Sequence, residues 1–446
     1  MTSLNGIGRY LGGIGEALSA RNYRVYWYGH LFSANGVWIY LISSQWLIFH
    51  LTRSPAWLGA VGFAYLAPLF FLGPLAGAVS DRFGHRRTGM IAVCLGIFVS
   101  LLTAFTIVTG NLTPLLMLIL TILQGVFMSF DFPARQALIP QLIERKNLSA
   151  AIGMNWTTFN VAGFIGPVIG GAILSFGNSA YGEPLGAAMS YTVSALALSC
   201  MVLGVTQVKI INPLPVVKRT GSLIPAVLSD LRAGISYIME STNLKIIILM
   251  LVFVALCLRS YQNLMAGFAK EVFLLDEQGL GNLLAASGIG ALFAALILAI
   301  RGRTQGLTRI YVYGAVLTAI ALLVFVSTTQ VPLALISITF VGGFIVSADI
   351  SAQTLVQNMV TDEYRARVIS IYLAIALGAS AFGTLAIGWL AEFIGFQLAL
   401  GAAAVAAMIA VVPKSGSSIR RATAVPRTNR NFLSEVIVTL VFFFDP

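Results

Sequence analysis

The sequence predicts an all-α membrane protein with twelve transmembrane helices in two pseudo-symmetric six-helix halves. Of its 446 residues, 58% are hydrophobic and 10% are charged, and the mean hydropathy is +0.89. These values lie far outside the range of soluble domains. The chain also contains many apolar stretches of about 20 residues, the length that crosses a bilayer as a helix. The third observation is an internal repeat that divides these stretches into two sets.

Windows of about 19 residues delimit the elements in order. The twelve predicted helices cover residues 24–51, 56–80, 88–109, 113–134, 147–175, 184–206, 246–269, 279–300, 308–327, 331–358, 368–392 and 394–412. We therefore expect five segments. They are a cytoplasmic N-terminal segment (1–23), a first half (24–206), a cytoplasmic linker (207–245), a second half (246–412) and a basic cytoplasmic tail (413–446).

The second half repeats features of the first. Shifting the sequence by 218 residues superimposes Asp131 on Asp349 and Pro114 on Pro332, together with four pairs of glycines. The matches fall at corresponding helix positions and place the long linker between the two copies. The sequence therefore predicts two parallel six-helix halves.

The basic residues behind the net charge of +11 are distributed unequally between the two sides of the membrane. With the N-terminus in the cytoplasm, all but three of the 27 Lys and Arg residues fall in cytoplasmic segments. The exceptions are Arg53, Lys270 and Arg259. This asymmetry is that of the positive-inside rule, so we expect both termini in the cytoplasm. The basicity then reports topology, and we expect no nucleic-acid partner.

Several classes of protein are disfavoured by missing patterns. The three Cys and three His residues show no metal-ligand spacing, so we expect no metal and no cofactor. The sequence lacks GxxxxGK[ST], which excludes an ATP-driven pump, and lacks HExxH and GxSxG, so we expect no enzyme and no catalytic residues. It also lacks a repeated selectivity filter. A non-transporting membrane receptor or scaffold stays open, because fold does not determine function.

The connection between the second and third predicted helices has the sequence GAVSDRFGHRR, residues 77–87. It resembles the G-x-x-x-D-R-x-G-R-R loop of the major facilitator superfamily, with His85 in place of the first closing arginine. The surrounding stretch further resembles the branch of siderophore exporters and drug-efflux proteins. The resemblance covers nearly the whole chain and implies the fold of that superfamily, which transports small molecules by alternating access.

The resemblance implies that this loop belongs to a gate that latches the halves together when the cavity faces outward. Gly77 is expected to allow close helix approach, Asp81 to end the helix, and the arginines to pair with carboxylates or anionic headgroups. Asp131, near the cytoplasmic end of its helix, is the expected carboxylate. The corresponding loop of the second half keeps only Gly302 and Arg303 of this motif. The gating set comprises Gly77, Asp81, Arg82, Gly84, Arg86, Arg87, Asp131 and Arg135.

The stretch VAGFIGPVIGG on the fifth predicted helix places glycines at small-residue spacing around a proline. This pattern permits close packing with a bend. It resembles the G-x-x-x-G-P-x-x-G-G signature of proton antiporters in the superfamily, which implies export. The residues are Gly163, Gly166, Pro167, Gly170 and Gly171.

Polar residues within the predicted spans are candidates for a substrate cavity, because uncompensated polar groups are costly in lipid. They are Asn35, Trp38, Gln45, Asn155, Asn160, Arg259, Gln262 and Asn263. Trp46, Trp156 and Tyr261 are further candidates. Arg259 lies near mid-bilayer, so we expect it to hold an anionic substrate group or to pair with an acid such as Asp349. Asp131 and Asp349 are the candidates for proton coupling.

These observations predict a secondary transporter. The expected function is proton-coupled export of a small amphipathic or anionic molecule, siderophore-like or drug-like, by alternating access. An uncoupled facilitator and a lysolipid transporter are the alternatives. The expected partners are a small-molecule substrate, protons and the lipid bilayer, and the expected state is a monomer in the bacterial cytoplasmic (inner) membrane.

Overall fold

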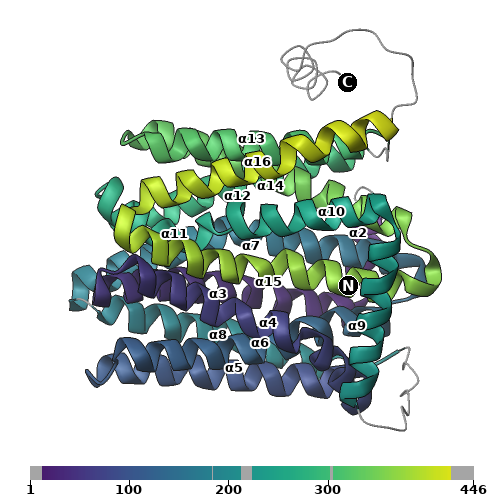
Figure 1. Cartoon of the computed structure of the whole chain (residues 1–446). Coiled ribbons are helices and arrows are strands. Elements are labelled where there is room, and N and C mark those ends of the chain that lie inside the picture. Colours follow the sequence, from purple (N-terminus) through teal and green to yellow (C-terminus); the bar gives the residue numbers. More distant parts are fainter. Residues whose placement is uncertain (1–12, 183, 212–222, 302–304, 423–446) are drawn as a thin grey trace.

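The computed structural model describes residues 13–182, 184–211, 223–301 and 305–422, which are helical with short connections (Figure 1). The first half consists of α3 (Arg21–Thr52), α4 (Pro55–Phe83), α5 (His85–Val108), α6 (Pro114–Leu142), α7 (Leu148–Tyr181) and α8 (Leu185–Gln207). The second half begins with a composite helix made of α10 (Thr242–Phe253), η2 (Val254–Leu258), α11 (Tyr261–Gly267) and η3 (Phe268–Val272). It continues with α12 (Glu277–Arg301), α13 (Leu307–Ser327), α14 (Val331–Met359), α15 (Asp362–Ile394) and α16 (Phe396–Ala422). The shorter elements are α2 (Gly13–Ser19), η1 (Arg145–Asn147) and α9 (Leu223–Glu240).

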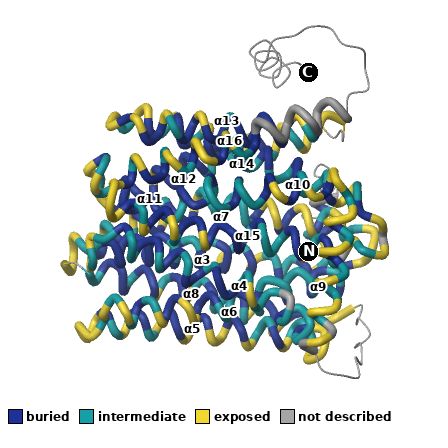
Figure 2. The backbone as a smooth tube through the Cα atoms, viewed as in Figure 1, coloured by how far each residue is buried: buried dark blue, intermediate teal, exposed yellow. Residues whose placement is uncertain are grey.

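The predicted all-α membrane fold is confirmed. Within the described ranges, ten helices are long and apolar enough to cross a membrane. The helices α3 and α16 run alongside them (Figure 1), so the part of the chain that the structure describes has twelve long helices in the bundle when α10 to η3 are taken as one. Buried residues concentrate in the middle of the bundle, where the halves meet (Figure 2). The halves touch mainly through two helix pairs, α4 with α15 and α7 with α12.

Local sequence signals set many helix ends. Ser54, Thr113 and Ser241 each precede a helix, and their side chains accept a hydrogen bond from a backbone N–H of its first turn. Gly84 joins α4 to α5 with φ +89°, a backbone region that favours glycine. Part of the loop motif is therefore explained by the turn that it makes.

Two expectations about the elements were wrong in detail. Asp81 does not end its helix, because α4 continues to Phe83 and turns at Gly84. The fourth helix does not stop near residue 134, because α6 continues through Pro133 and Pro140 to Leu142. The predicted linker at residues 207–245 also contains a helix that we did not expect, α9, which lies across the ends of the bundle helices (Figure 1). A helix can tolerate internal prolines where neighbouring helices and side chains satisfy the freed backbone groups.

Parts of several predicted segments lie outside the described residues. These parts are residues 1–12 of the N-terminal segment, 212–222 of the linker and 423–446 of the tail. Gly302 and Arg303 also lie outside them.

The bundle has two different ends, which we name by α9. The "α9 end" carries α9 and the turn at Gly84, and the "opposite end" carries the connections after α3 and before α12. At the opposite end the halves touch through small residues. A Cβ atom built on Gly59 would lie 2.7 Å from the carbonyl oxygen of Thr384, and one on Gly171 would lie 2.7 Å from that of Glu277.

The same helix faces separate toward the α9 end. On α4, Gly73 and Gly77 continue the face of Gly59 and Gly62, since their spacings follow the helical repeat. A Cβ atom built on Gly73 or Gly77 would meet no atom within 4 Å. The close helix approach expected at Gly77 is therefore absent from this conformation.

The helix α7 shows the same change along its length. Gly153 shares a face with Phe164 and Gly171, yet a Cβ atom on Gly153 would meet nothing within 4 Å. The structure is thus closed at the opposite end and open between the halves at the α9 end.

Candidate functional site

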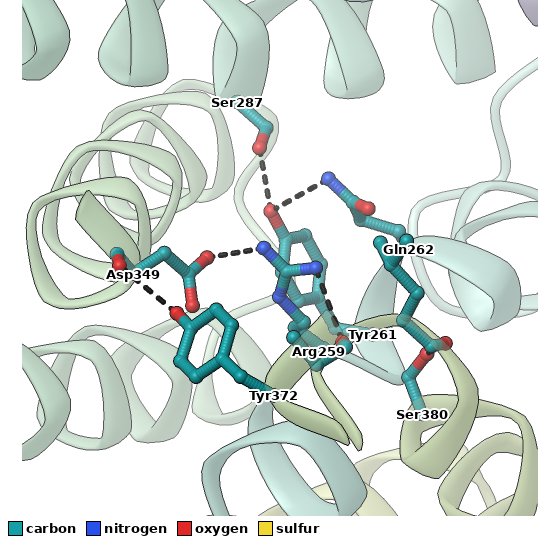
Figure 3. Close-up of polar contacts among 9 residues, drawn as sticks. Arg259, Tyr261, Gln262, Ser287, Asp349, Tyr372 and Ser380 are labelled. Atoms are coloured by element: carbon teal, nitrogen blue, oxygen red, sulfur yellow. Dashed lines mark hydrogen bonds and ion pairs between the residues drawn. The ribbon is translucent and has the colours of Figure 1, made fainter. Parts of the chain in front are cut away.

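An ion pair joins two helices of the second half (Figure 3). Arg259 lies at the end of the π-helical segment η2, and its Nη2 donates to Oδ2 of Asp349 on α14. The same guanidinium donates through Nη1 to the carbonyl oxygen of Ala376 on α15, at 3.4 Å. One arginine therefore links three helices.

Aromatic and hydroxyl groups hold this pair in place (Figure 3). Tyr372 donates from its hydroxyl to the backbone oxygen of Asp349 at 3.1 Å. Tyr261 forms a hydrogen bond with the Ser287 hydroxyl at 2.6 Å, and Gln262 donates to the Tyr261 oxygen at 3.4 Å. These contacts hold the backbone of Asp349 and the residues that follow Arg259.

The pair lies deep in the bundle. Arg259 is seventeen residues after the start of α10 and thirteen before the end of η3. Asp349 is ten residues before the end of α14, about 15 Å along the axis. Asp349 therefore lies well inside α14. Its pairing with Arg259 is one of the two alternatives expected for this arginine.

Arg259 lies on a helix face that borders the first half. Asn263, one turn later on the same helix face, lies against Gly62 of α4. Phe70 of α4 still packs against Gly378 of α15, and α4 loses its contacts at Gly73. Arg259 bonds to Ala376, two residues from Gly378, so it lies where the halves begin to separate. Its side chain is 29% exposed, although it is far from either end of its helix.

The first half contains a second carboxylate–guanidinium pair. Arg135 Nη2 lies 2.6 Å from Oδ2 of Asp131, and both groups are on α6, one turn apart. Arg135 Nη1 also donates to the Ser33 hydroxyl of α3 at 2.8 Å. Asp131 was expected to lie near a helix end and to pair with arginines of the loop at residues 77–87. It lies instead eleven residues inside α6, where Arg135 is within reach.

A polar network surrounds this first-half pair. Tyr23 donates to the Asn155 side chain at 3.0 Å, and Asn155 donates to the Tyr26 hydroxyl at 3.3 Å. His30 Nε2 lies 3.2 Å from the Asn155 backbone oxygen. Asn155, a candidate for the substrate cavity, thus belongs to a network within the first half. A pocket beside it is lined by Tyr26, His30, Ala34, Val37, Met128, Asp131, Phe132, Arg135, Gln136, Asn155, Trp156 and Phe159.

The gating residues of the loop do not form one cluster here. Asp81 is 58% exposed and lies 3.7 Å from His85 Nε2. Arg86 donates to the Thr206 carbonyl oxygen at the end of α8, at 2.9 Å. Arg82 lies over the ring of Phe83, and Arg87 is exposed. Arg86, Asp131 and Arg135 line a common pocket, whereas Asp81 does not.

The glycine–proline motif of α7 contacts both halves. Gly163 and Gly166 face Trp38 of α3, and Gly170 faces Ile39 and Ile42 of the same helix. Gly171 faces α12, and the backbone of Pro167 approaches Gly281 there. The motif therefore allows α7 to pack closely on its own half and on the other half.

Three candidate cavity residues on α3 carry an unsatisfied polar atom. Asn35 Oδ1, Trp38 Nε1 and Gln45 Oε1 are buried and lack a hydrogen-bond partner among the described residues. Such groups are uncommon in proteins, because each costs free energy without a partner. Of the other candidates, Asn160 bonds to its own helix, and Asn263 donates to the Thr384 hydroxyl.

The opposite end is sealed by contacts that we did not expect from the sequence. Asn178 of α7 donates to Glu277 of α12 at 2.7 Å. Glu392 of α15 accepts from the Ser54 hydroxyl at 2.7 Å and from the Ala56 backbone N–H at 3.1 Å, at the start of α4. Lys270 lies 4.6 Å from the Trp46 ring centroid. Only the docking of the halves brings these residues together.

The loop carboxylate can be tested directly. We expect Asp81→Asn to reduce transport severalfold if the loop belongs to the gate. Membrane insertion and substrate binding should stay close to wild type, because the Asp81 side chain is exposed and its only described ion pair is with His85. The measurement is flux in proteoliposomes beside equilibrium binding in detergent, with a conservative Asp81→Glu variant as control. Unchanged flux in Asp81→Asn would remove the gating role.

The match to a family of transporters, together with the shared fold, identifies a transporter of the major facilitator superfamily, and not an enzyme. A family model described as "Transmembrane secretion effector" matches residues 16–442, so the chain belongs to that family.

Named relatives are transporters. The chain is 26% identical to the staphyloferrin A transporter of Staphylococcus aureus, over 76% of this chain and 82% of the relative. It is 28% identical to the multidrug efflux pump Tap of Mycobacterium tuberculosis, over 32% of this chain and 36% of the relative.

Solved structures share the fold. A bacterial homologue of the lysosomal transporter Spinster, in an inward-facing and unoccupied conformation, aligns with a TM-score of 0.69 and 14% identity. The alignment covers 93% of this chain and 99% of that one. A D-xylose–proton symporter aligns with a TM-score of 0.67 and 15% identity, covering 90% and 99%.

Proposed function

We propose that this transporter exports a small anionic or amphipathic molecule, siderophore-like or drug-like, in exchange for protons. The observation that carries the proposal is the Arg259–Asp349 pair on the face between the halves, at the point where they separate. An arginine at this depth is costly in lipid and is retained where it meets a polar partner or substrate.

The pair suits exchange of an anion against a carboxylate. A guanidinium offers several N–H donors in a planar fork, so a carboxylate or phosphate of the substrate can replace Asp349 at Arg259. Asp349 released in this way becomes a group that can accept a proton. The unsatisfied atoms of Asn35, Trp38 and Gln45 offer further hydrogen bonds to polar groups of the substrate.

The proposed topology places the α9 end and both termini in the cytoplasm, and the protein in the bacterial inner membrane. The distribution of Lys and Arg supports this orientation. The opening between the halves then faces the cytoplasm, and Glu277, Glu392 and Asn178 close the outer side. Export requires that these outer contacts break after the substrate binds.

The relatives support a cargo of this kind. The staphyloferrin A transporter is named for a siderophore, and Tap is named a multidrug efflux pump. The glycine–proline motif of α7 resembles that of proton antiporters, and its close contacts extend to α3 and α12.

Reconstitution with an imposed pH gradient tests the proposal. Proteoliposomes with an acidic lumen are offered labelled siderophores, drugs and lysolipids. We expect one anionic or amphipathic class to accumulate in the lumen, because transporters with their cytoplasmic side outward exchange it for leaving protons. A protonophore should abolish this accumulation, and protein-free liposomes are the control.

Other outcomes assign other functions. Equilibration without accumulation identifies an uncoupled facilitator, and accumulation of lysolipids alone identifies a lysolipid transporter. Specific binding without flux for any class identifies a receptor or scaffold.

A further inference from the structure

The linker helix α9 has three distinct faces. Its first face packs on the second half. Asp230 accepts from Arg367 Nε of α15 at 2.9 Å, and Tyr237 stacks on Tyr364 at a centroid distance of 4.7 Å. Ile238 is 5% exposed, and Gly234 lies close to Ile371. The ion pair and the stacked rings fix α9 to the end of α15, so its orientation is defined by the protein.

The second face is apolar and uncovered. Leu228, Ile235 and Met239 are 59%, 52% and 56% exposed. Their separations of seven and eleven residues put them on one side of the helix, and Arg232, also exposed, falls between them. The third face is polar and exposed, and it carries Ser229, Ser236 and Glu240 at the same separations.

The three faces of α9 are best explained if the helix lies where protein, lipid and water meet, and not in water alone. A helix surrounded by protein and water has two faces, whereas one that also touches a bilayer has a third, apolar face with basic residues at its edge. The helix α9 also lies across the ends of the transmembrane helices, and hence along the membrane plane (Figure 1).

We propose that the stripe formed by Leu228, Arg232, Ile235 and Met239 binds the membrane surface, with the apolar side chains at the acyl boundary and Arg232 on an anionic lipid headgroup. Charge favours this occupant, because Arg232 is the one charged residue of the stripe, and Lys245, exposed at the start of α10, adds a second basic group at the same end. Each such residue strengthens binding to anionic lipid.

Lipid bound to this stripe would act on the transport cycle. Besides α15 and α10 of the second half, α9 touches α4 of the first half. The helices α4 and α15 form one of the two pairs that join the halves. Lipid that holds α9 at the membrane surface is therefore expected to affect how α4 and α15 separate at the α9 end. This inference concerns the membrane and does not depend on the proposed cargo.

Fluorescence quenching at two adjacent positions tests the proposal. The full chain, with Cys94, Cys200 and Cys257 replaced, carries a nitrobenzoxadiazole label on a single cysteine, Ile235→Cys or the matched control Ser236→Cys. The protein is reconstituted into vesicles of phosphatidylcholine, with or without phosphatidylglycerol. One set of vesicles contains doxyl-labelled lipid, which quenches labels in contact with lipid. The other set has iodide on both sides of the membrane, which quenches labels in contact with water. We expect lipid to quench position 235 severalfold more than position 236, and iodide to show the reverse order.

Arg232→Gln should reduce the gain in lipid quenching that phosphatidylglycerol gives at position 235, by up to about fivefold. Equal quenching of both positions by iodide would place the helix in water and overturn the proposal. Shielding of position 235 from both quenchers would indicate a protein partner or a second copy, and would also overturn it. Neither result bears on whether the protein transports a substrate.

Discussion

Arg259→Ala is expected to reduce transport by about 30-fold or more. Removing one partner of a buried, hydrogen-bonded ion pair costs on the order of 2–5 kcal/mol, and for this partly buried pair we take the lower value, which corresponds to about 30-fold. The loss has two sources here, since Asp349 is left without its guanidinium and the substrate loses its proposed anchor. The measurement is initial flux in proteoliposomes at matched protein content.

Two further variants separate folding from transport. Arg259→Ala combined with Asp349→Ala should recover thermal stability, because no unpaired charge is left, while flux stays low. Arg259→Lys keeps the charge and loses the planar fork, so an anionic probe should lose more affinity than a neutral one. Equal losses for both probes, or wild-type flux in Arg259→Ala, would contradict the anion-binding role.

Gly171→Ala is expected to reduce transport about tenfold by holding the opposite end open. The new Cβ atom would lie 2.7 Å from the Glu277 carbonyl oxygen and 3.4 Å from Gln278 Cα. These are backbone atoms, so α7 and α12 must separate, and overpacking of this kind costs about 1–3 kcal/mol. Spin labels on the exposed residues Asn111 and Ser327, in the two halves, should report a longer distance across this end.

Gly153→Ala is the matched control, because it lies on the same face of the same helix and its Cβ atom meets nothing within 4 Å. Both substitutions remove a helix glycine, so the propensity gain is the same. The control should leave the distance between labels at the opposite end unchanged. An unchanged distance in Gly171→Ala would show that this contact does not set the conformation.

The transmembrane helices could be predicted because each is a long apolar stretch, and hydropathy measures that property directly. The helix α9 could not, because Asp230 and Arg232 interrupt its apolar residues and a hydropathy window averages its three faces. The fourth helix was predicted too short, because Pro133 and Arg135 look like an end. In the folded chain Arg135 donates to Asp131 and to Ser33.

The site was partly predictable for a related reason. The depth of Arg259 demanded a polar partner or a substrate, and few acids lie within the predicted spans, so Asp349 could be named as one possible partner. The seal formed by Asn178, Glu277 and Glu392 could not be predicted, because it depends on how two separately packed halves dock. The gating role of Asp81 remains a prediction.

The two repeat-matched aspartates differ in the helix that supplies their arginine, so the two ion pairs respond differently when helices move. Asp131 is paired from its own helix, so its ion pair is carried along unchanged when helices slide. Asp349 is paired from another helix, and Arg259 follows a π-helical segment, a feature frequent at functional sites. The position of the arginine thus makes the first ion pair independent of helix sliding and the second one sensitive to it.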